Sequence, residues 1–149
     1  MMWHFKKKNI ENFKNEDGYT LLELLVVLVI ITLIIGIAGP MVLRQFGAAK
    51  SDTARIEVNR LVTDLEFFRV DVGRFPTETE GLDALLIQPD GLVGWEGPYM
   101  PKASQKIDPW GRDYLYLLEN DGQRAVVSSL GADGAEGGEG ENLDLSSKD

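Results

Sequence analysis

An uninterrupted run of 20 uncharged residues, 24–43, constrains the fold of this chain more than any other feature. A helix of that length rises about 30 Å, roughly the hydrocarbon thickness of a bilayer, so the run is long enough to cross a membrane. Glu23 directly precedes it. A carboxylate at the edge of a membrane span is costly unless it is paired, which makes Glu23 a candidate functional residue that needs a cation.

Composition narrows the functional classes. The 106 residues 44–149 are enough for one modest domain, and the formal net charge of −9 argues against a nucleic-acid partner. The chain has no cysteine, and its single histidine, His4, lies near the start. Disulfides, thiolate metal sites and a histidine-based triad or zinc site in the domain are therefore excluded. Since no phosphate-binding loop is present either, we expect a protein that is not an enzyme.

The first 18 residues are polar with a basic cluster, and hydropathy alone would predict an uncleaved signal anchor. The sequence from Gly18 to Glu23, Gly-Tyr-Thr-Leu-Leu-Glu, changes this interpretation because it resembles the processing site of type IV prepilins and pseudopilins. The resemblance implies a leader, 1–18, that a prepilin peptidase removes by cutting between Gly18 and Tyr19. It also implies N-methylation of the new terminus at Tyr19. The family usually has Phe at this position and basic residues just before the glycine, where this chain has Glu16 and Asp17.

Processing would supply the cation that Glu23 needs. Cutting after Gly18 frees the α-amine of Tyr19, and a staggered neighbouring subunit can bring that amine against Glu23. A subunit in the wrong register would leave an unpaired buried charge, which costs several kcal/mol. Pro40 should kink the same helix because it lacks an amide hydrogen. It is either a tolerated membrane-helix proline or a bend that shapes subunit packing, and the resemblance favours the second.

The pattern of apolar residues in segment 44–73 predicts an amphipathic continuation of the helix that begins in the apolar segment 19–43. Apolar residues recur at steps of three and four, and Gly73 is a suitable stop signal. The recurring apolar residues are Ala54, Val58, Leu61, Val62, Leu65, Phe68 and Val72. The simplest interpretation is one long helix, half embedded in the membrane and half packed on the domain.

The remaining segment, 74–149, predicts a small α+β domain. Residues 80–86 favour a short helix, and residues 114–118 and 125–129 favour a hairpin about Asp121-Gly122. Four motifs here occur in the order seen in major pseudopilins of type II secretion systems, which the chain resembles: Phe75-Pro76-Thr77, Gly97-Pro98-Tyr99, Asp108-Pro109-Trp110-Gly111 and Ser129-Leu130-Gly131-Ala132-Asp133-Gly134. The resemblance implies a type IV pilin-like fold, with a long N-terminal helix packed on a small antiparallel sheet. We interpret the third motif as a structural turn with a core tryptophan.

The stretch 135–145 is dense in acidic residues and glycines. By composition alone it is either a disordered tail or a loop folded around a hard cation such as calcium, whose ligands are oxygens. The resemblance favours calcium, because major pseudopilins bind it in the corresponding loop. The residues that match the family's ligands are Asp133, Asn142, Asp144 and the backbone carbonyl of Leu130, with Glu139 and Glu141 in reserve.

The resemblance implies a structural subunit that is made as a single-pass inner-membrane protein, with its C-terminal domain in the periplasm. It would form a homopolymer, the periplasmic pseudopilus, together with minor pseudopilins and the inner-membrane assembly platform. Growth of this filament would drive export of folded proteins across the outer membrane. The alternative in the same superfamily is a subunit of a type IV or DNA-uptake pilus. Two further alternatives belong to other classes of protein. The first is a membrane-anchored periplasmic binding module, which would be uncleaved. The second is a membrane-tethered hydrolase, which is disfavoured because the domain has no histidine and no cysteine.

Overall fold

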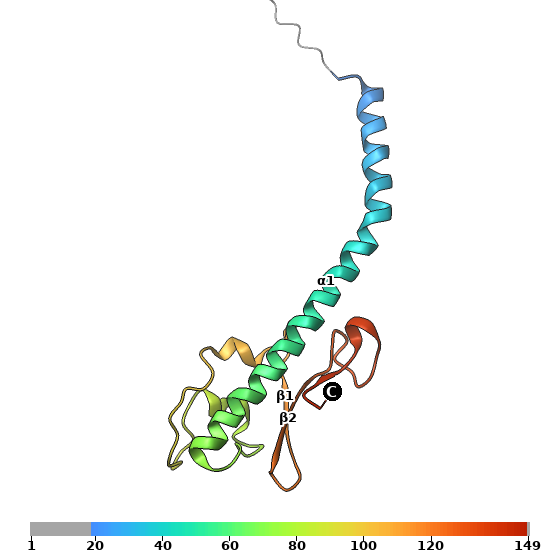
Figure 1. Cartoon of the computed structure of the whole chain (residues 1–149). Helices are drawn as coiled ribbons and strands as arrows, with labels where there is room; N and C mark the ends of the chain where they lie inside the picture. Colours follow the sequence, from blue (N-terminus) through green and yellow to red (C-terminus); the bar gives the residue numbers. More distant parts are fainter. Residues whose placement is uncertain (1–18, 149) are drawn as a thin grey trace, which may run out of the picture. The chain divides into compact units, whose positions relative to one another are not determined.

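One helix, α1 (Leu21–Val72), dominates the structure, a computed structural model that describes residues 19–148 (Figure 1). Thr20 precedes it, and the Thr20 Oγ1 accepts a hydrogen bond from the Glu23 amide at 3.2 Å, which satisfies one of the free N–H groups of the first turn. Gly73 ends it with a φ of 84°, and its amide donates to the Arg69 carbonyl at 2.8 Å. The single long helix and its stop at Gly73 are confirmed.

The chain divides into two compact units between Pro40 and Met41, three residues before the expected boundary at 43/44. The helix itself continues through Pro40. In the first unit no residue from Leu21 to Pro40 is buried, and the helix there is long and apolar enough to cross a membrane. The predicted kink at Pro40 stays a prediction, and the leader 1–18 lies outside the described residues.

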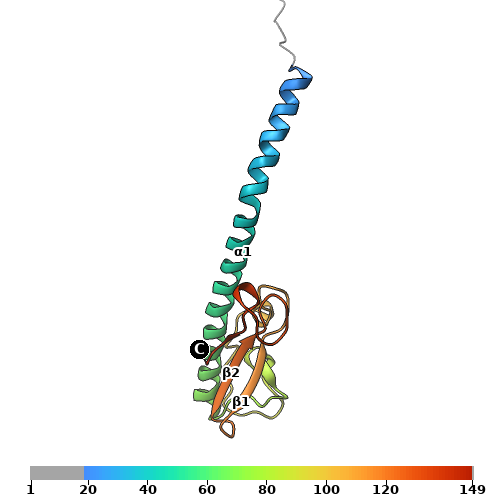
Figure 2. The ribbon, with the colours of Figure 1, turned by 90° about the vertical axis from the view of Figure 1, so that its right-hand side faces the viewer.

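The second unit holds the hydrophobic core. One face of the C-terminal part of α1 packs against a three-stranded antiparallel sheet and the loops that precede it. The strands are β1 (Leu115–Glu119), β2 (Arg124–Ser129) and β3 (Leu145–Ser146), in that spatial order. Figure 2 shows β1 and β2 side by side next to α1. This is the α+β, pilin-like arrangement that the sequence predicts.

The predicted hairpin is correct to within one residue at each strand. Glu119 pairs with Arg124, so the turn spans four residues, of which Asn120, Asp121 and Gly122 have positive φ. The predicted short helix is the 3₁₀ helix η1 (Gly81–Leu85), and two further 3₁₀ helices are η2 (Ala103–Lys106) and η3 (Gly140–Asn142). The strand β3 has no counterpart among the predicted strands, because two residues carry no alternating pattern.

Candidate functional site

The predicted assembly residues lie at the start of α1. Tyr19 and Glu23 are both exposed, and within residues 19–148 no side chain pairs with the Glu23 carboxylate. The carboxylate also lies in the first turn, where the positive end of the helix dipole favours it. Gly18, the other half of the expected cleavage site, lies outside the described residues. Glu23 therefore keeps the free carboxylate that pairing with another subunit requires.

The acidic loop, residues 131–144, is closed at its neck by the backbone. The Ala132 amide donates to the Glu141 carbonyl at 2.9 Å. Gly131 has a φ of 63°, and a Cβ added there would lie 2.7 Å from the Asn142 carbonyl oxygen. A Cβ at Gly138 would lie 2.5 Å from the same oxygen. The loop thus folds tightly around the Asn142 carbonyl, at positions where only glycine fits.

The two best-matched ligands differ in their surroundings. The Asp144 Oδ2 accepts a hydrogen bond from the Gly137 amide at 2.8 Å, whereas its Oδ1 is buried and has no hydrogen-bond partner within residues 19–148. The Asp133 side chain is exposed, and its Oδ1 accepts from the Ala135 amide at 3.1 Å. In the part of the chain that the structure describes, no three acidic or histidine side chains gather as a metal-binding group. A calcium ion here would need backbone carbonyls as well as carboxylates.

The turn that begins at Asp108 is held in place by hydrogen bonds to the Asp108 carboxylate. The carboxylate is buried, and its Oδ1 accepts hydrogen bonds from the amides of Trp110 at 3.0 Å and Arg112 at 2.9 Å. Its Oδ2 accepts from the Ser129 hydroxyl at 2.7 Å. The expected structural turn is present, but Trp110 is only half-buried and lies outside the hydrophobic core. Its indole N–H instead donates a hydrogen bond to Glu141.

This turn holds both ends of the acidic loop. The Arg112 guanidinium donates to the carbonyls of Gly131 and Ala132, and the Trp110 Nε1 donates to the Glu141 Oε1 at 3.0 Å. Sequence reasoning missed both contacts, because 19 to 31 residues separate the partners and no local pattern connects them. Glu141, expected as a reserve calcium ligand, is directed to Trp110.

The Phe75-Pro76-Thr77 motif is fixed by an ion pair between Arg74 and Glu80. The Arg74 Nη1 and Nη2 donate to the two Glu80 oxygens at 2.7 and 2.8 Å, and the Thr77 amide donates to the same carboxylate at 2.7 Å. These bonds lower the pKa of Glu80 to about 2, and the hydrogen bond with Arg74 is the largest cause. Tyr116 donates its hydroxyl hydrogen to the Pro76 carbonyl at 2.7 Å, and burial raises its pKa. The motif is a structural clamp.

Comparison with known proteins now assigns the chain. A family model described as "Type II secretion system (T2SS), protein G" matches residues 41–148, and one described as "Prokaryotic N-terminal methylation motif" matches residues 13–39. The chain belongs to the type II secretion system protein G family. Its relatives include the type II secretion system core protein G of Xanthomonas campestris pv. campestris, 36% identical over 87% of this chain and 88% of the relative. The core protein G of Vibrio cholerae is 34% identical over 91% and 94% of the two chains.

The fold of this protein G family member has a solved counterpart. The crystal structure of the major pseudopilin from the type 2 secretion system of enterohaemorrhagic Escherichia coli matches it with a TM-score of 0.53 and 26% sequence identity. The match covers 66% of this chain and 86% of that chain. The pseudopilin resemblance found in the motifs is therefore confirmed, and the pilus subunit of another system is not favoured.

Proposed function

We propose that this chain is the structural subunit that polymerises into the periplasmic pseudopilus of a type II secretion system. Growth of that filament drives export of folded proteins across the outer membrane. The observation that carries the proposal is the pair of matches, protein G over residues 41–148 and the methylation motif over residues 13–39. A type IV or DNA-uptake pilin would share the second match but not the first.

The precursor is anchored in the inner membrane by the apolar segment 19–43, with the domain 74–149 in the periplasm. A prepilin peptidase cuts between Gly18 and Tyr19, and the Tyr19 amine is methylated. The membrane assembly platform then adds the subunit beneath minor pseudopilins. The supporting features are the apolar helix, whose residues 21–40 bury no side chain, and the matched methylation motif.

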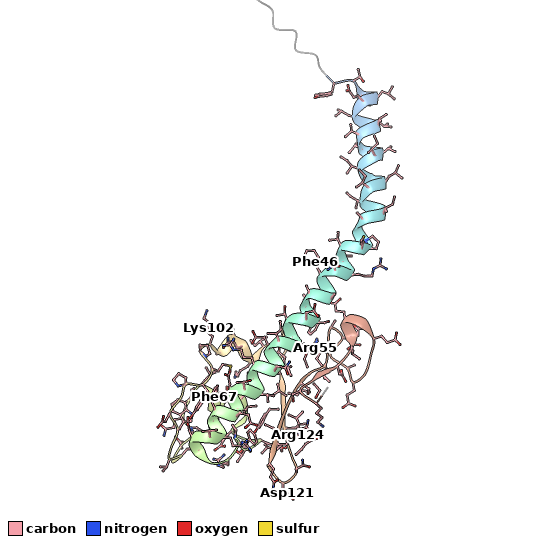
Figure 3. All side chains as sticks on the ribbon, viewed as in Figure 1. Phe46, Arg55, Phe67, Lys102, Asp121 and Arg124 are labelled. Atoms are coloured by element: carbon pink, nitrogen blue, oxygen red, sulfur yellow. The ribbon has the colours of Figure 1, made fainter. Side chains whose placement is uncertain are left out.

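Polymerisation rests on two features of α1. The first is the pairing of the Tyr19 amine of one copy with Glu23 of the next. The second is a set of large apolar side chains that stay exposed on the C-terminal part of the helix. Those side chains are Phe46, Ile56, Phe67 and Val70, of which Figure 3 labels Phe46 and Phe67. Exposed apolar groups of this size are suited to contacts with neighbouring copies.

The role is structural and not enzymatic. Groups that would suit catalysis elsewhere are engaged in the fold: Asp108 caps its turn and Glu80 pairs with Arg74. We assign no catalytic residue and no nucleic-acid partner to the chain.

Intact mass tests the processing step. The full chain is expressed with and without a prepilin peptidase, purified in detergent and weighed. The expected product with the peptidase begins at Tyr19 and carries one methyl group; without it, the mass is that of the precursor. A precursor mass in both samples would contradict the proposal and favour an uncleaved anchor. Export of a folded substrate by a strain that lacks its own major pseudopilin then separates a secretion subunit from a pilin.

We further propose that calcium binds in the acidic loop. Its ligands are the carboxylates of Asp133 and Asp144, Asn142 and the Leu130 carbonyl, with Glu139 in reserve. The strongest support is the buried Asp144 Oδ1, which lacks a hydrogen-bond partner within residues 19–148 and would be satisfied by a cation. The donors are hard oxygens, which calcium prefers, and the glycines of the loop adopt positive φ angles that allow the backbone to turn sharply.

Thermal unfolding of the full chain in detergent tests the calcium proposal. Calcium should raise the Tm and a chelator should lower it, because an ion that binds only the folded loop stabilises it. Asp144→Ala should abolish the shift. Asp121→Ala, which removes an exposed acid at the hairpin turn, should leave it intact. A wild-type Tm that is unchanged by the chelator would refute the calcium site.

A further inference from the structure

The Glu141 side chain leaves the acidic loop and lies across α1 at Gly47. A Cβ added to Gly47 would lie 2.5 Å from the Glu141 Oε2 and 2.7 Å from its Cδ, so a methyl group at this position would displace the end of the Glu141 side chain. Gly47 alone is buried among residues 41–50, although its neighbours on α1 are exposed. The carboxylate is therefore seated directly on the helix backbone.

The other oxygen of this carboxylate is held by the indole of Trp110. The Trp110 Nε1 donates to the Glu141 Oε1 at 3.0 Å, and Asp108 fixes Trp110 through the backbone amide of that residue. Within residues 19–148 no lysine or arginine forms an ion pair with Glu141. The position of the Glu141 carboxylate is thus set by the neutral indole N–H of Trp110 on one side and by the absence of a side chain at Gly47 on the other.

We propose that Trp110, Glu141 and Gly47 form a clasp that docks the acidic loop on α1, so that Glu141 is a positioning residue and not a calcium ligand. The calcium part of this proposal rests on the proposed function; the docking part does not. The clasp joins the loop to the helix four residues beyond Leu43, where the predicted membrane segment ends. An ordered loop and the first extramembrane turns of α1 are consequently coupled.

The clasp preorganises the loop for calcium. A loop that is already docked loses less conformational freedom when it binds an ion, so its affinity is higher. Partners that orient a metal loop without touching the metal typically contribute 10–100-fold in affinity. Glu141→Ala and Trp110→Phe should each weaken calcium binding by about tenfold. Glu141→Gln keeps an acceptor oxygen for Trp110 and should retain most of the affinity, which a true carboxylate ligand would lose.

Gly47→Ala gives a separate test. Helix propensity alone predicts that this change stabilises α1, whereas the clasp predicts that it releases the acidic loop from α1. Alanine is favoured over glycine inside a helix by about 1 kcal/mol, so without the clasp this change would stabilise α1. With the clasp, the added methyl group displaces Glu141 and frees the loop. Gly36→Ala is the matched control, since a Cβ added there meets no atom within 4 Å.

Amide hydrogen exchange of the full chain in detergent, without calcium, measures docking directly. Residues 131–144 should exchange faster in Gly47→Ala and in Glu141→Ala, and the double variant should exchange no faster than Glu141→Ala alone, because both changes break one contact. Unchanged exchange in Gly47→Ala, or additive effects in the double variant, would overturn the clasp. Normal clasp behaviour in a chain that binds no calcium would refute only the calcium proposal. Loss of calcium binding by Glu141→Gln equal to that of Asp144→Asn would make Glu141 a ligand and overturn its assigned role.

Discussion

The two segments of α1 on either side of the Pro40–Met41 boundary differ in where their partners lie. From Leu21 to Pro40 no residue is buried by the rest of the chain, although almost all side chains are apolar. From Met41 to Val72 one face of the helix lies in the core, with Leu65 and Phe68 fully buried. One continuous helix therefore combines a segment that the rest of the described chain leaves uncovered with a segment that packs into the core of the domain.

Within residues 19–148, Glu23 in the first segment and Asp64 in the second each have a carboxylate oxygen without a hydrogen-bonding partner, and the two differ in their surroundings. The Glu23 side chain is exposed and free to meet a cation from another copy. Asp64 is buried, its Oδ2 has no hydrogen-bond partner within residues 19–148, and burial raises its pKa. A free carboxylate at the start of the helix is available for assembly, whereas one against the core is a cost to folding.

Glu23→Ala, a change in the first segment of α1, should produce the largest effect of the four predictions, and that effect should be on filament formation. Cleavage after Gly18 should continue, because the cut precedes the changed residue, whereas filament formation should be lost since the Tyr19 amine of each copy has no partner. An unpaired charge in apolar packing costs about 3–5 kcal/mol per subunit. Electron microscopy of filaments, with intact mass for cleavage, measures both steps.

Asp121→Ala is the control for this change, because Asp121 is an exposed acid on the hairpin turn (Figure 3). It should assemble normally. Normal filaments from Glu23→Ala would show that pairing with the Tyr19 amine is not what sets the register.

Leu65→Ala and Leu28→Ala test the same comparison through folding. Leu65 is fully buried in the core cluster, so its truncation should cost about 2–5 kcal/mol of unfolding free energy, including the cavity that remains. Leu28 is 64% exposed, and its truncation should leave the unfolding of the domain unchanged. Denaturant unfolding of the full chain in detergent measures both. Equal losses would mean that the first segment also stabilises the domain.

The comparison also separates what the sequence could predict from what it could not. The long helix, its end at Gly73 and the hairpin follow from local signals: apolar spacing, a glycine that takes positive φ and a turn dipeptide. The docking of Glu141 on Gly47 and the hold of Arg112 on Gly131 depend on residues that the fold brings together from distant positions. The two-residue strand β3 is defined only by its pairing with β2.

Local periodicity also separates apolar residues with different surroundings. Leu65 and Phe67 are two positions apart, but the first is buried and the second is 59% exposed. The three-and-four spacing includes Leu65 and omits Phe67, so the face of α1 that the domain covers could be predicted from the sequence.

Asp64→Asn should have a smaller effect, and the size of that effect depends on pH. Because burial raises the pKa of Asp64, folding favours the protonated carboxyl. That contribution is present below about pH 4, the ordinary pKa of an unfolded Asp, and is lost as the pH rises through the raised value. Asparagine does not ionise, so at pH 7 the variant should be more stable than the wild type by about 1 kcal/mol, and the gain should shrink towards pH 4. A variant that is less stable at pH 7 would show that the ionised carboxylate has a favourable partner.

The Arg74–Glu80 pair should give the smallest effect, with the opposite dependence on pH. The pKa of Glu80 is lowered to about 2, so its contribution is present above about pH 4.3, the ordinary value for Glu, and is lost as the pH falls towards 2. Since the Arg74 side chain is 41% exposed, solvent screens the pair, and we expect Glu80→Gln to cost about 0.5–1 kcal/mol at pH 7 and clearly less at pH 2, where the Glu80 carboxyl is half protonated. Glu96→Gln, a change at an exposed acid without a side-chain hydrogen bond in the described structure, should be neutral at both. Urea unfolding of the two variants across this pH range measures the effect, because a cost that is the same at pH 2 as at pH 7 would assign it to lost packing and not to the ion pair.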